Sequence, residues 1–69
     1  GVKLTGKEFK LTSREIEICN LIKNGLTSKE ITTILNISHG TTERHRANIR
    51  RKLGIIKKDI NLSSFLKTL

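Results

Sequence analysis

The residues best suited to chemistry lie in one basic stretch, from Ser38 to Gly54. An arginine can form two hydrogen bonds to the edge of guanine, a carboxylate can accept one from the cytosine amino group, and a methyl group can contact that of thymine. Helical spacing places Glu43, Arg44 and Ala47 on one outward stripe of this stretch. If the stretch is a helix in the major groove of DNA, these three residues are predicted to contact bases.

A second set of residues is suited to phosphate, which cations, hydroxyls and amides bind without reading base sequence. The predicted phosphate contacts are Lys29, Thr41, His45, Asn48, Arg50 and Arg51. Backbone N–H groups at two helix starts are expected to add to them. His45 has a second interpretation, because a histidine near an apolar face often bonds a neighbouring backbone group instead.

The bulk composition also favours a nucleic-acid partner. In 69 residues, fourteen Lys and Arg against six Asp and Glu give a formal charge of +8, which in so short a chain indicates a polyanion. The length allows one small domain with a modest core. Paired carboxylates, a nucleophile with a base and a phosphate-binding glycine loop are all missing from the sequence, so we predict no enzyme, cofactor or small-molecule ligand.

Metal and membrane sites are not expected either. Cys19 is the single cysteine, without the Cys/His company of a zinc site, and is predicted to be a small packed side chain. His39 and His45 do not make a metal pair by themselves. No apolar run reaches the roughly 18 to 20 residues that span a bilayer, and the N-terminus lacks a secretory signal. We expect a cytoplasmic protein without a membrane partner.

The basic stretch carries the start and stop signals of a helix at about 39–53. Ser38 can cap the first backbone N–H groups, and Gly54 can take the left-handed conformation that closes a helix. Spacings of three and four residues define an inner face that can lie on a core. The predicted members of that face are Thr42, Arg46, Ile49 and Leu53.

Two more helices are predicted before it. Thr12 and Glu15 have the spacing of a capping box, which predicts a helix from Ser13 to about 24–25. Its apolar stripe is expected to be Ile18, Cys19 and Ile22, with Ile16 and Leu21 at the margins.

Thr27 and Glu30 form a second capping box, which predicts a helix of about two turns that ends at 36–37. The residues expected at apolar spacing in it are Ile31, Ile34 and Leu35. The turn that separates this helix from the basic one is only a few residues long. The two helices are therefore predicted to form a helix-turn-helix unit over 28–47.

The ends of the chain complete the predicted organisation. Residues 1–10 have no clear period and are interpreted as a linker or the end of an upstream segment. A fourth helix is expected over about 58–68, and no strand pattern competes with it. The predicted fold is all-α, with four helices in one domain over 11–69.

Four blocks of residues, in order, resemble the LuxR/GerE/NarL-type helix-turn-helix domain of bacterial transcriptional regulators. The resemblance covers 11 to about 66, and its blocks are Leu11-Thr12-Ser13-Arg14-Glu15, Gly25-Leu26-Thr27-Ser28-Lys29-Glu30-Ile31, Leu35-Asn36-Ile37-Ser38, and 41–54. It implies the C-terminal effector domain of a regulator, with the helix at about 39–53 in the major groove of double-stranded DNA.

The resemblance also implies a homodimer on DNA through the fourth helix, with RNA polymerase as a further partner. Asn61 and Ser64 are small polar residues that permit close helix approach, and Phe65 can add apolar contact, so these three are the predicted dimer interface. Leu62 and Leu66 have two open interpretations, because they could face a partner or complete the monomer's own core.

Three positions depart from the family pattern. Thr32 stands where alanine is usual and Thr42 where valine is usual, and each hydroxyl is expected to bond a carbonyl one turn back at a small cost in stability. Lys57 stands where a capping serine or threonine is common, so the first turn of the fourth helix is expected to fray.

Two rival interpretations fit part of the sequence. A sigma-factor-like promoter-recognition domain that also contacts RNA polymerase has a similar pattern, but such domains generally end soon after the recognition helix, whereas an apolar stripe continues past Gly54. A basic module lying on anionic membranes would need an aromatic belt, and the chain has two Phe and no Trp or Tyr.

Overall fold

The computed structural model describes residues 9–54 and 61–68, and the regular elements among them are helices. They are α2 (Ser13–Lys23), α3 (Ser28–Leu35), α4 (His39–Lys52) and α5 (Leu62–Lys67). The all-α prediction is therefore confirmed for this part of the chain. The predicted helix-turn-helix unit corresponds to α3, the turn at 36–38 and the N-terminal part of α4.

Both predicted capping boxes form. At the start of α2, the Thr12 N–H donates to Glu15 Oε1 at 2.8 Å, and the Glu15 N–H donates to Thr12 Oγ1 at 3.1 Å. Thr27 and Glu30 make the same two bonds at the start of α3, at 2.8 and 3.2 Å. Each box satisfies backbone N–H groups that have no partner inside the helix.

The tight turn between α3 and α4 depends on Asn36 and Ser38. Asn36 is in the left-handed conformation, with φ 54°, which asparagine adopts more readily than most residues. The Ile37 N–H then reaches the Thr32 carbonyl at 3.2 Å and closes α3. Ser38 caps α4 as predicted, because its Oγ accepts from the Thr41 N–H at 3.0 Å.

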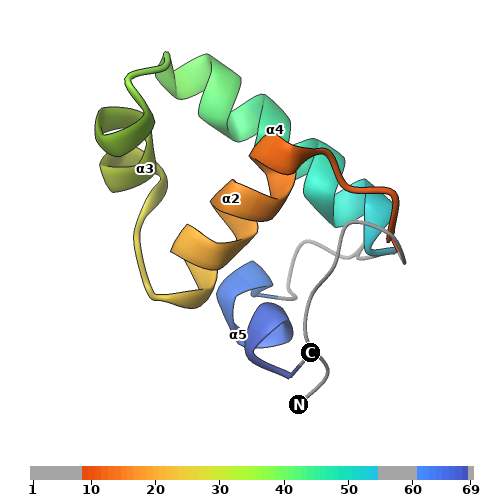
Figure 1. The fold of residues 1–69 in the computed structure, drawn as a ribbon. Helices are drawn as coiled ribbons and strands as arrows, with labels where there is room; N and C mark the ends of the chain where they lie inside the picture. Colours follow the sequence, from red (N-terminus) through yellow and green to blue (C-terminus); the bar gives the residue numbers. More distant parts are fainter. Residues whose placement is uncertain (1–8, 55–60, 69) are drawn as a thin grey trace.

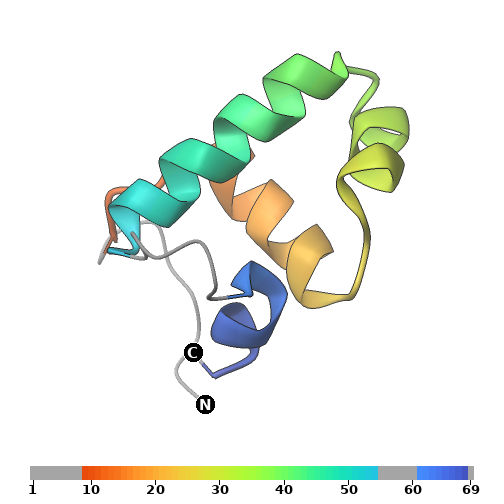
Figure 2. The same cartoon turned by 180° about the vertical axis from the view of Figure 1, so that it is seen from behind.

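Helix α2 lies at the centre of the domain and packs against α3, α4 and α5. Figures 1 and 2 show it between α4, which runs along one side, and α5 on the other. Every helix contributes to the buried core, which consists of Leu11, Ile18, Cys19, Ile22, Ile31, Ile49, Leu62 and Leu66. This core fixes the basic helix α4 relative to α5.

The threonines at the two departures from the family pattern bond each other. Thr32 Oγ1 of α3 and Thr42 Oγ1 of α4 are 2.7 Å apart. The fully buried Thr42 also donates to the Ser38 carbonyl at 3.3 Å. The predicted bond to a carbonyl one turn back is therefore confirmed for Thr42, whereas the partner of Thr32 is the hydroxyl on the facing helix.

The same contact explains why the prediction for Ile34 is wrong. Ile34 was expected on the apolar stripe of α3, but it is 57 % exposed. Ile31 is fully buried and Leu35 packs against the core, and Thr32 faces α4. Because Ile34 lies on the opposite side of Ile31 from these two residues, it points to solvent.

The C-terminal helix is shorter than predicted. Asn61 was expected inside it but is extended (ψ 121°) and caps it instead, with Oδ1 accepting from the Ser64 N–H at 3.0 Å. Lys57 and 58–60 lie outside the described residues. Leu62 and Leu66 are 2 % and 1 % exposed, so they complete the monomer's own core.

Most of the predicted linker, 1–10, also lies outside the described residues. Phe9 is an exception, because it is partly buried and packs against the core.

Candidate nucleic-acid interface

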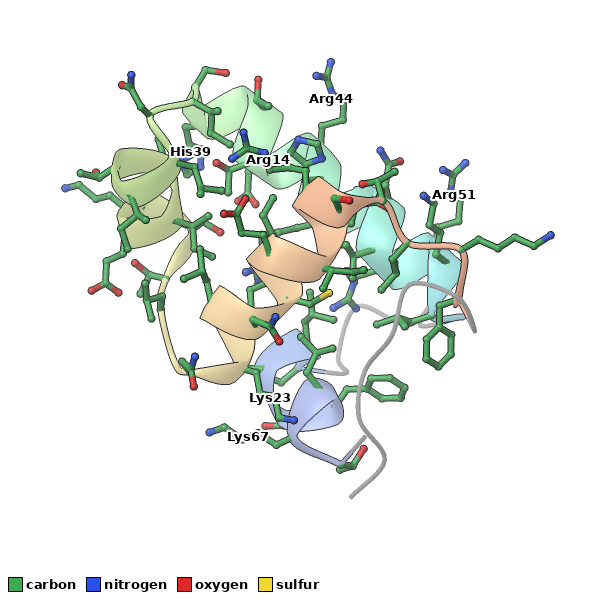
Figure 3. All side chains as sticks on the ribbon, viewed as in Figure 1. Arg14, Lys23, His39, Arg44, Arg51 and Lys67 are labelled. Carbon is green, nitrogen blue, oxygen red and sulfur yellow. The ribbon has the colours of Figure 1, made fainter. Side chains whose placement is uncertain are left out.

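Helix α4 has one buried side and one exposed side. Thr42 and Ile49 are fully buried, whereas Arg44 and Ala47 are exposed. Figure 3 shows the Arg44 and Arg51 side chains projecting from α4 away from α2. The exposed side thus presents cations and a methyl group to solvent.

Glu43, the third predicted base-contacting residue, is held by its own chain. Ser28 of α3 donates from Oγ to Glu43 Oε2 at 3.3 Å. Within α4, His39 Nε2 lies 3.5 Å from Oε1 and Arg46 Nε lies 3.6 Å from Oε2. The Glu43 side chain is nevertheless 50 % exposed, so its carboxylate remains accessible.

The role of Arg46 was not predicted from the sequence, which placed it on the inner face. Its side chain is 27 % exposed and reaches Glu43 at the edge of that face. Oppositely charged residues three or four positions apart on a helix are neighbours. The spacing of Arg46 and His39 from Glu43 was therefore the signal that could have identified this cluster.

Two of the predicted phosphate-contacting residues lie at helix starts. Lys29 is exposed in the first turn of α3. Thr41 lies in the first turn of α4, where its Oγ1 is 2.8 Å from Ser38 Oγ. Both positions are beside backbone N–H groups at the positive end of a helix dipole, which favours anions.

Three further predicted phosphate contacts lie in the second half of α4. Arg51 is exposed and donates to Asn48 Oδ1 at 3.2 Å, while Arg50 is partly buried. The positive charges of Arg50 and Arg51 also complement the negative end of the helix.

His45 is partly buried, and its Nδ1 is enclosed without a hydrogen-bond partner among the described residues. The alternative interpretation of His45, a bond to a neighbouring backbone group, is therefore not realised at Nδ1 in this part of the chain. Contact of His45 with phosphate remains a prediction.

A partly buried ion pair that was not predicted joins the end of α4 to the start of α2. Lys52 Nζ lies 2.6 Å from Glu15 Oε1, and the Glu15 side chain is 4 % exposed. Burial opposes ionisation of Glu15, but hydrogen bonds from Lys52 and Thr12 and the charge of Lys52 outweigh it and lower its pKa. The sequence did contain a signal for this pair. Lys52 follows the inner-face residue Ile49 by three positions, so a helix places the two on the same side.

The predicted dimer residues differ in their surroundings. Asn61 and Ser64 are exposed, although the Asn61 side chain is also the cap of α5. Phe65 is partly buried and packs against the monomer's core. Ser63 holds α5 on α2, because its Oγ donates to the Ile22 carbonyl at 3.0 Å.

The described residues also bear on metal, thiol and membrane sites. No group of three or more His, Cys, Asp and Glu residues there could hold a metal ion. Cys19 is fully buried, as predicted. Its burial and the negative charge of Glu15 raise the pKa of the thiol to about 11. None of the described helices is long and apolar enough to cross a membrane.

Comparison with known proteins agrees with this geometry. The family model described as bacterial regulatory proteins, luxR family, matches residues 10–59. The uncharacterized response regulatory protein YgeK of Escherichia coli (strain K12) is 51 % identical over 45 residues, which are 65 % of this chain and 31 % of that protein. The transcriptional regulatory protein UhpA of the same strain is 36 % identical over 64 residues, 91 % of this chain and 32 % of that protein.

The nitrate/nitrite response regulator protein NarP, also of Escherichia coli (strain K12), is 40 % identical over 45 residues, 65 % of this chain and 21 % of that protein. This chain thus spans a third or less of the length of these relatives. No solved structure matches. The family match includes α2, α3 and α4 with every residue predicted to contact DNA, and the chain therefore belongs to the luxR family of bacterial regulatory proteins, whose helix-turn-helix domains bind DNA.

Proposed function

We propose that residues 11–69 are the C-terminal effector domain of a bacterial transcription regulator, which binds double-stranded DNA sequence-specifically with α4 in the major groove. The division of α4 into a buried and a cationic side carries this proposal. Thr42 and Ile49 hold the helix on the core, while Arg44, Ala47 and Arg51 are exposed. A helix presented in this way can enter the groove as a rigid body.

Within this proposal the N-terminal half of α4 reads bases. Arg44 forks onto guanine, Ala47 contacts a thymine methyl group, and Glu43 accepts from a cytosine amino group. The remaining contacts are to phosphates and set the register of the domain on DNA. They come from Lys29, Thr41, His45, Asn48, Arg50 and Arg51.

Helix α5 favours a regulator over a sigma-factor-like domain. Leu62 and Leu66 complete the core, so α5 is an integral part of the fold, while Asn61 and Ser64 are exposed and Phe65 is partly exposed. We propose a homodimer on DNA through Asn61, Ser64 and Phe65, with RNA polymerase as a further partner. Such a regulator acts in the cytoplasm, where bacterial DNA lies, and residues 1–10 link it to an upstream segment.

The salt dependence of DNA binding tests the proposal. Each phosphate that the domain neutralises releases condensed counterions, so four to six contacts per monomer should give a log–log slope of about −4 to −5. Fluorescence anisotropy with a labelled duplex, titrated at several salt concentrations, measures this slope. A flat response, or no binding at low salt, would refute the DNA-binding proposal.

Two arginine variants test the division between base and phosphate contacts. On a duplex selected for tight binding, Arg44→Ala should cost about 1–3 kcal/mol, and on a scrambled duplex much less, because a base contact carries specificity. Arg51→Ala should weaken binding to both duplexes alike and reduce the salt slope by about 1. Equal losses for Arg44→Ala on the two duplexes would reassign Arg44 to the phosphate contacts.

A further inference from the structure

Glu43 is a carboxylate on a surface proposed to face DNA. The phosphates repel its negative charge, so neighbours that offset the charge and fix its direction would be needed for it to approach a base. Glu43 has three neighbours, of which Arg46 supplies a positive charge and Ser28 a hydrogen bond. Ser28 donates to Oε2, Arg46 lies 3.6 Å from the same oxygen, and His39 lies 3.5 Å from Oε1.

These neighbours come from three separate positions around the carboxylate. Ser28 belongs to α3, His39 precedes Glu43 by one turn of α4, and Arg46 follows it by one turn. Arg46 carries a permanent positive charge. Ser28 itself is fixed by its place directly after Thr27, the N-cap of the α3 capping box.

The contacts leave Glu43 both oriented and reachable. Its side chain is 50 % exposed, and a carboxylate offers about four acceptor sites on its two oxygens. It can therefore keep its neighbours and still accept a hydrogen bond from a base. A side chain that is already held in its bound conformation loses less entropy on binding than a mobile one.

Resting on the proposed function, we infer that Arg46 and Ser28 are positioning residues for Glu43 and thereby determine the preference at one base pair. A carboxylate accepts from the amino groups that cytosine and adenine present in the major groove, whereas guanine and thymine present acceptor oxygens that repel it. Arg46 and Ser28 keep the carboxylate directed toward the groove. Removing either one should weaken the preference for an amino-bearing base without abolishing DNA binding.

The experiment compares variants on four duplexes that differ at a single base pair. That base pair is first located as the position where Glu43→Gln changes base preference most. Arg46→Met keeps the apolar stem of a partly buried side chain and removes its charge, and Ser28→Ala keeps the Thr27 cap.

Arg14→Met is the matched control. Arg14 Nη1 lies 3.3 Å from Glu17 Oε1 on α2, so this variant loses the same charge from an i,i+3 pair that does not involve Glu43. Thermal unfolding of each variant verifies that it is folded. If Arg46→Met does not fold, Ser28→Ala provides the same test.

The wild type and Arg14→Met should prefer the amino-bearing base by about tenfold, and Arg46→Met and Ser28→Ala by about threefold or less. Preserved wild-type preference in Arg46→Met and Ser28→Ala would overturn the inference, although the domain still binds DNA. The absence of any position at which Glu43→Gln alters preference would overturn it as well. Failure of the wild type to bind any duplex would refute the proposed function instead.

Discussion

At the scale of single residues, the Thr32–Thr42 contact shows how two departures from the family pattern compensate each other. Each threonine brings a hydroxyl to an interface where the pattern has a methyl-bearing residue. A polar group that is buried without a partner costs about 1–3 kcal/mol. The 2.7 Å contact gives the partly buried Thr32 hydroxyl a partner, while the fully buried Thr42 hydroxyl also donates to the Ser38 carbonyl.

A double-mutant cycle should therefore reveal coupling between the two threonines. Thr42→Val alone should destabilise the domain by about 1–2 kcal/mol, because it leaves the Thr32 hydroxyl without its partner. Thr32→Ala alone should also destabilise it, but the double variant should be about 1 kcal/mol more stable than the sum of the single losses predicts. Urea unfolding gives the free energy of unfolding of the wild type, the two single variants and the double variant. Strictly additive losses would contradict the coupling.

The two capping boxes could be predicted from the sequence because their partners are close together in the chain. The capping boxes follow from a spacing of three residues, so Thr12 with Glu15 and Thr27 with Glu30 could be paired by pattern alone. The contact of Ser28 with Glu43 joins residues fifteen positions apart. No local periodicity specifies such a pair, because it depends on how α3 and α4 pack.

At the scale of elements, the Glu15–Lys52 pair connects the first turn of α2 to the last turn of α4. The residues are 37 positions apart in sequence, and Glu15 Oε1 also accepts the Thr12 N–H. One carboxylate thus caps α2 and holds the end of the basic helix. Lys52 is thereby directed into the domain, in contrast to the exposed Arg51 beside it.

The pH dependence of stability should report this pair. The pKa of Glu15 in the folded state lies below its ordinary value of 4.5. The contribution of ionised Glu15 to the free energy of unfolding should therefore be fully present above pH 4.5. It should be lost as the pH falls through the lower folded-state pKa of Glu15. Urea unfolding between pH 7 and pH 2 should show this loss.

Glu15→Gln should cost about 1–3 kcal/mol at pH 7, less than a fully buried pair because Lys52 is partly exposed, and it should flatten the acid dependence. Glu30→Gln is the matched control, since the Thr27 backbone bond also lowers the pKa of Glu30 but no cation of residues 9–54 or 61–68 forms an ion pair with it. If both variants lost the same stability, the Lys52 pair would make no contribution of its own.

Element boundaries were predictable where caps mark them and less so elsewhere. Helices α2, α3 and α4 begin after Thr12, Thr27 and Ser38 as expected. Asn61 was not recognised as the cap of α5, because an asparagine within an apolar stripe is compatible with a longer helix. In α3, eight residues were too few for the pattern to show that Thr32, not Ile34, faces its neighbour.

At the scale of the whole molecule, the size of the domain bears on how two copies can assemble on DNA. The domain measures 28 × 25 × 19 Å, and half-sites one DNA turn apart are about 34 Å from centre to centre. The longest of these dimensions is shorter than that spacing, so two copies on successive major grooves can make at most a small contact, which the proposed dimer assigns to α5. A helix of six residues contributes much less than the ~800 Å² per partner of a standard interface.

We expect the domain to be monomeric in solution and dimeric on an inverted repeat with half-sites about 10 base pairs apart. Sedimentation with and without the duplex measures the oligomeric state of the domain. Asn61→Asp preserves a good N-cap while adding negative charge at the proposed interface, and Ser64→Glu adds it one turn later. Both variants should lose cooperative two-site binding while they retain single-site binding.

Asn20→Asp is the control for this test, because it adds the same charge to an exposed position of α2. It should bind both half-sites as the wild type does. Cooperative occupancy of both half-sites by Ser64→Glu and Asn61→Asp would show that α5 is not the dimer surface.

Because Cys19 is buried, chemical modification of its thiol reports how often the core of the domain opens. Cys19 is the chain's single cysteine, and in the folded state its thiol is fully buried with a pKa raised by that burial to about 11, so it is neither accessible nor reactive as a thiolate at pH 7. A disulfide reagent therefore modifies the protein almost entirely through molecules whose core has opened. Because a ligand that binds only the folded form reduces the open population, DNA should slow this modification by the factor with which it stabilises the fold.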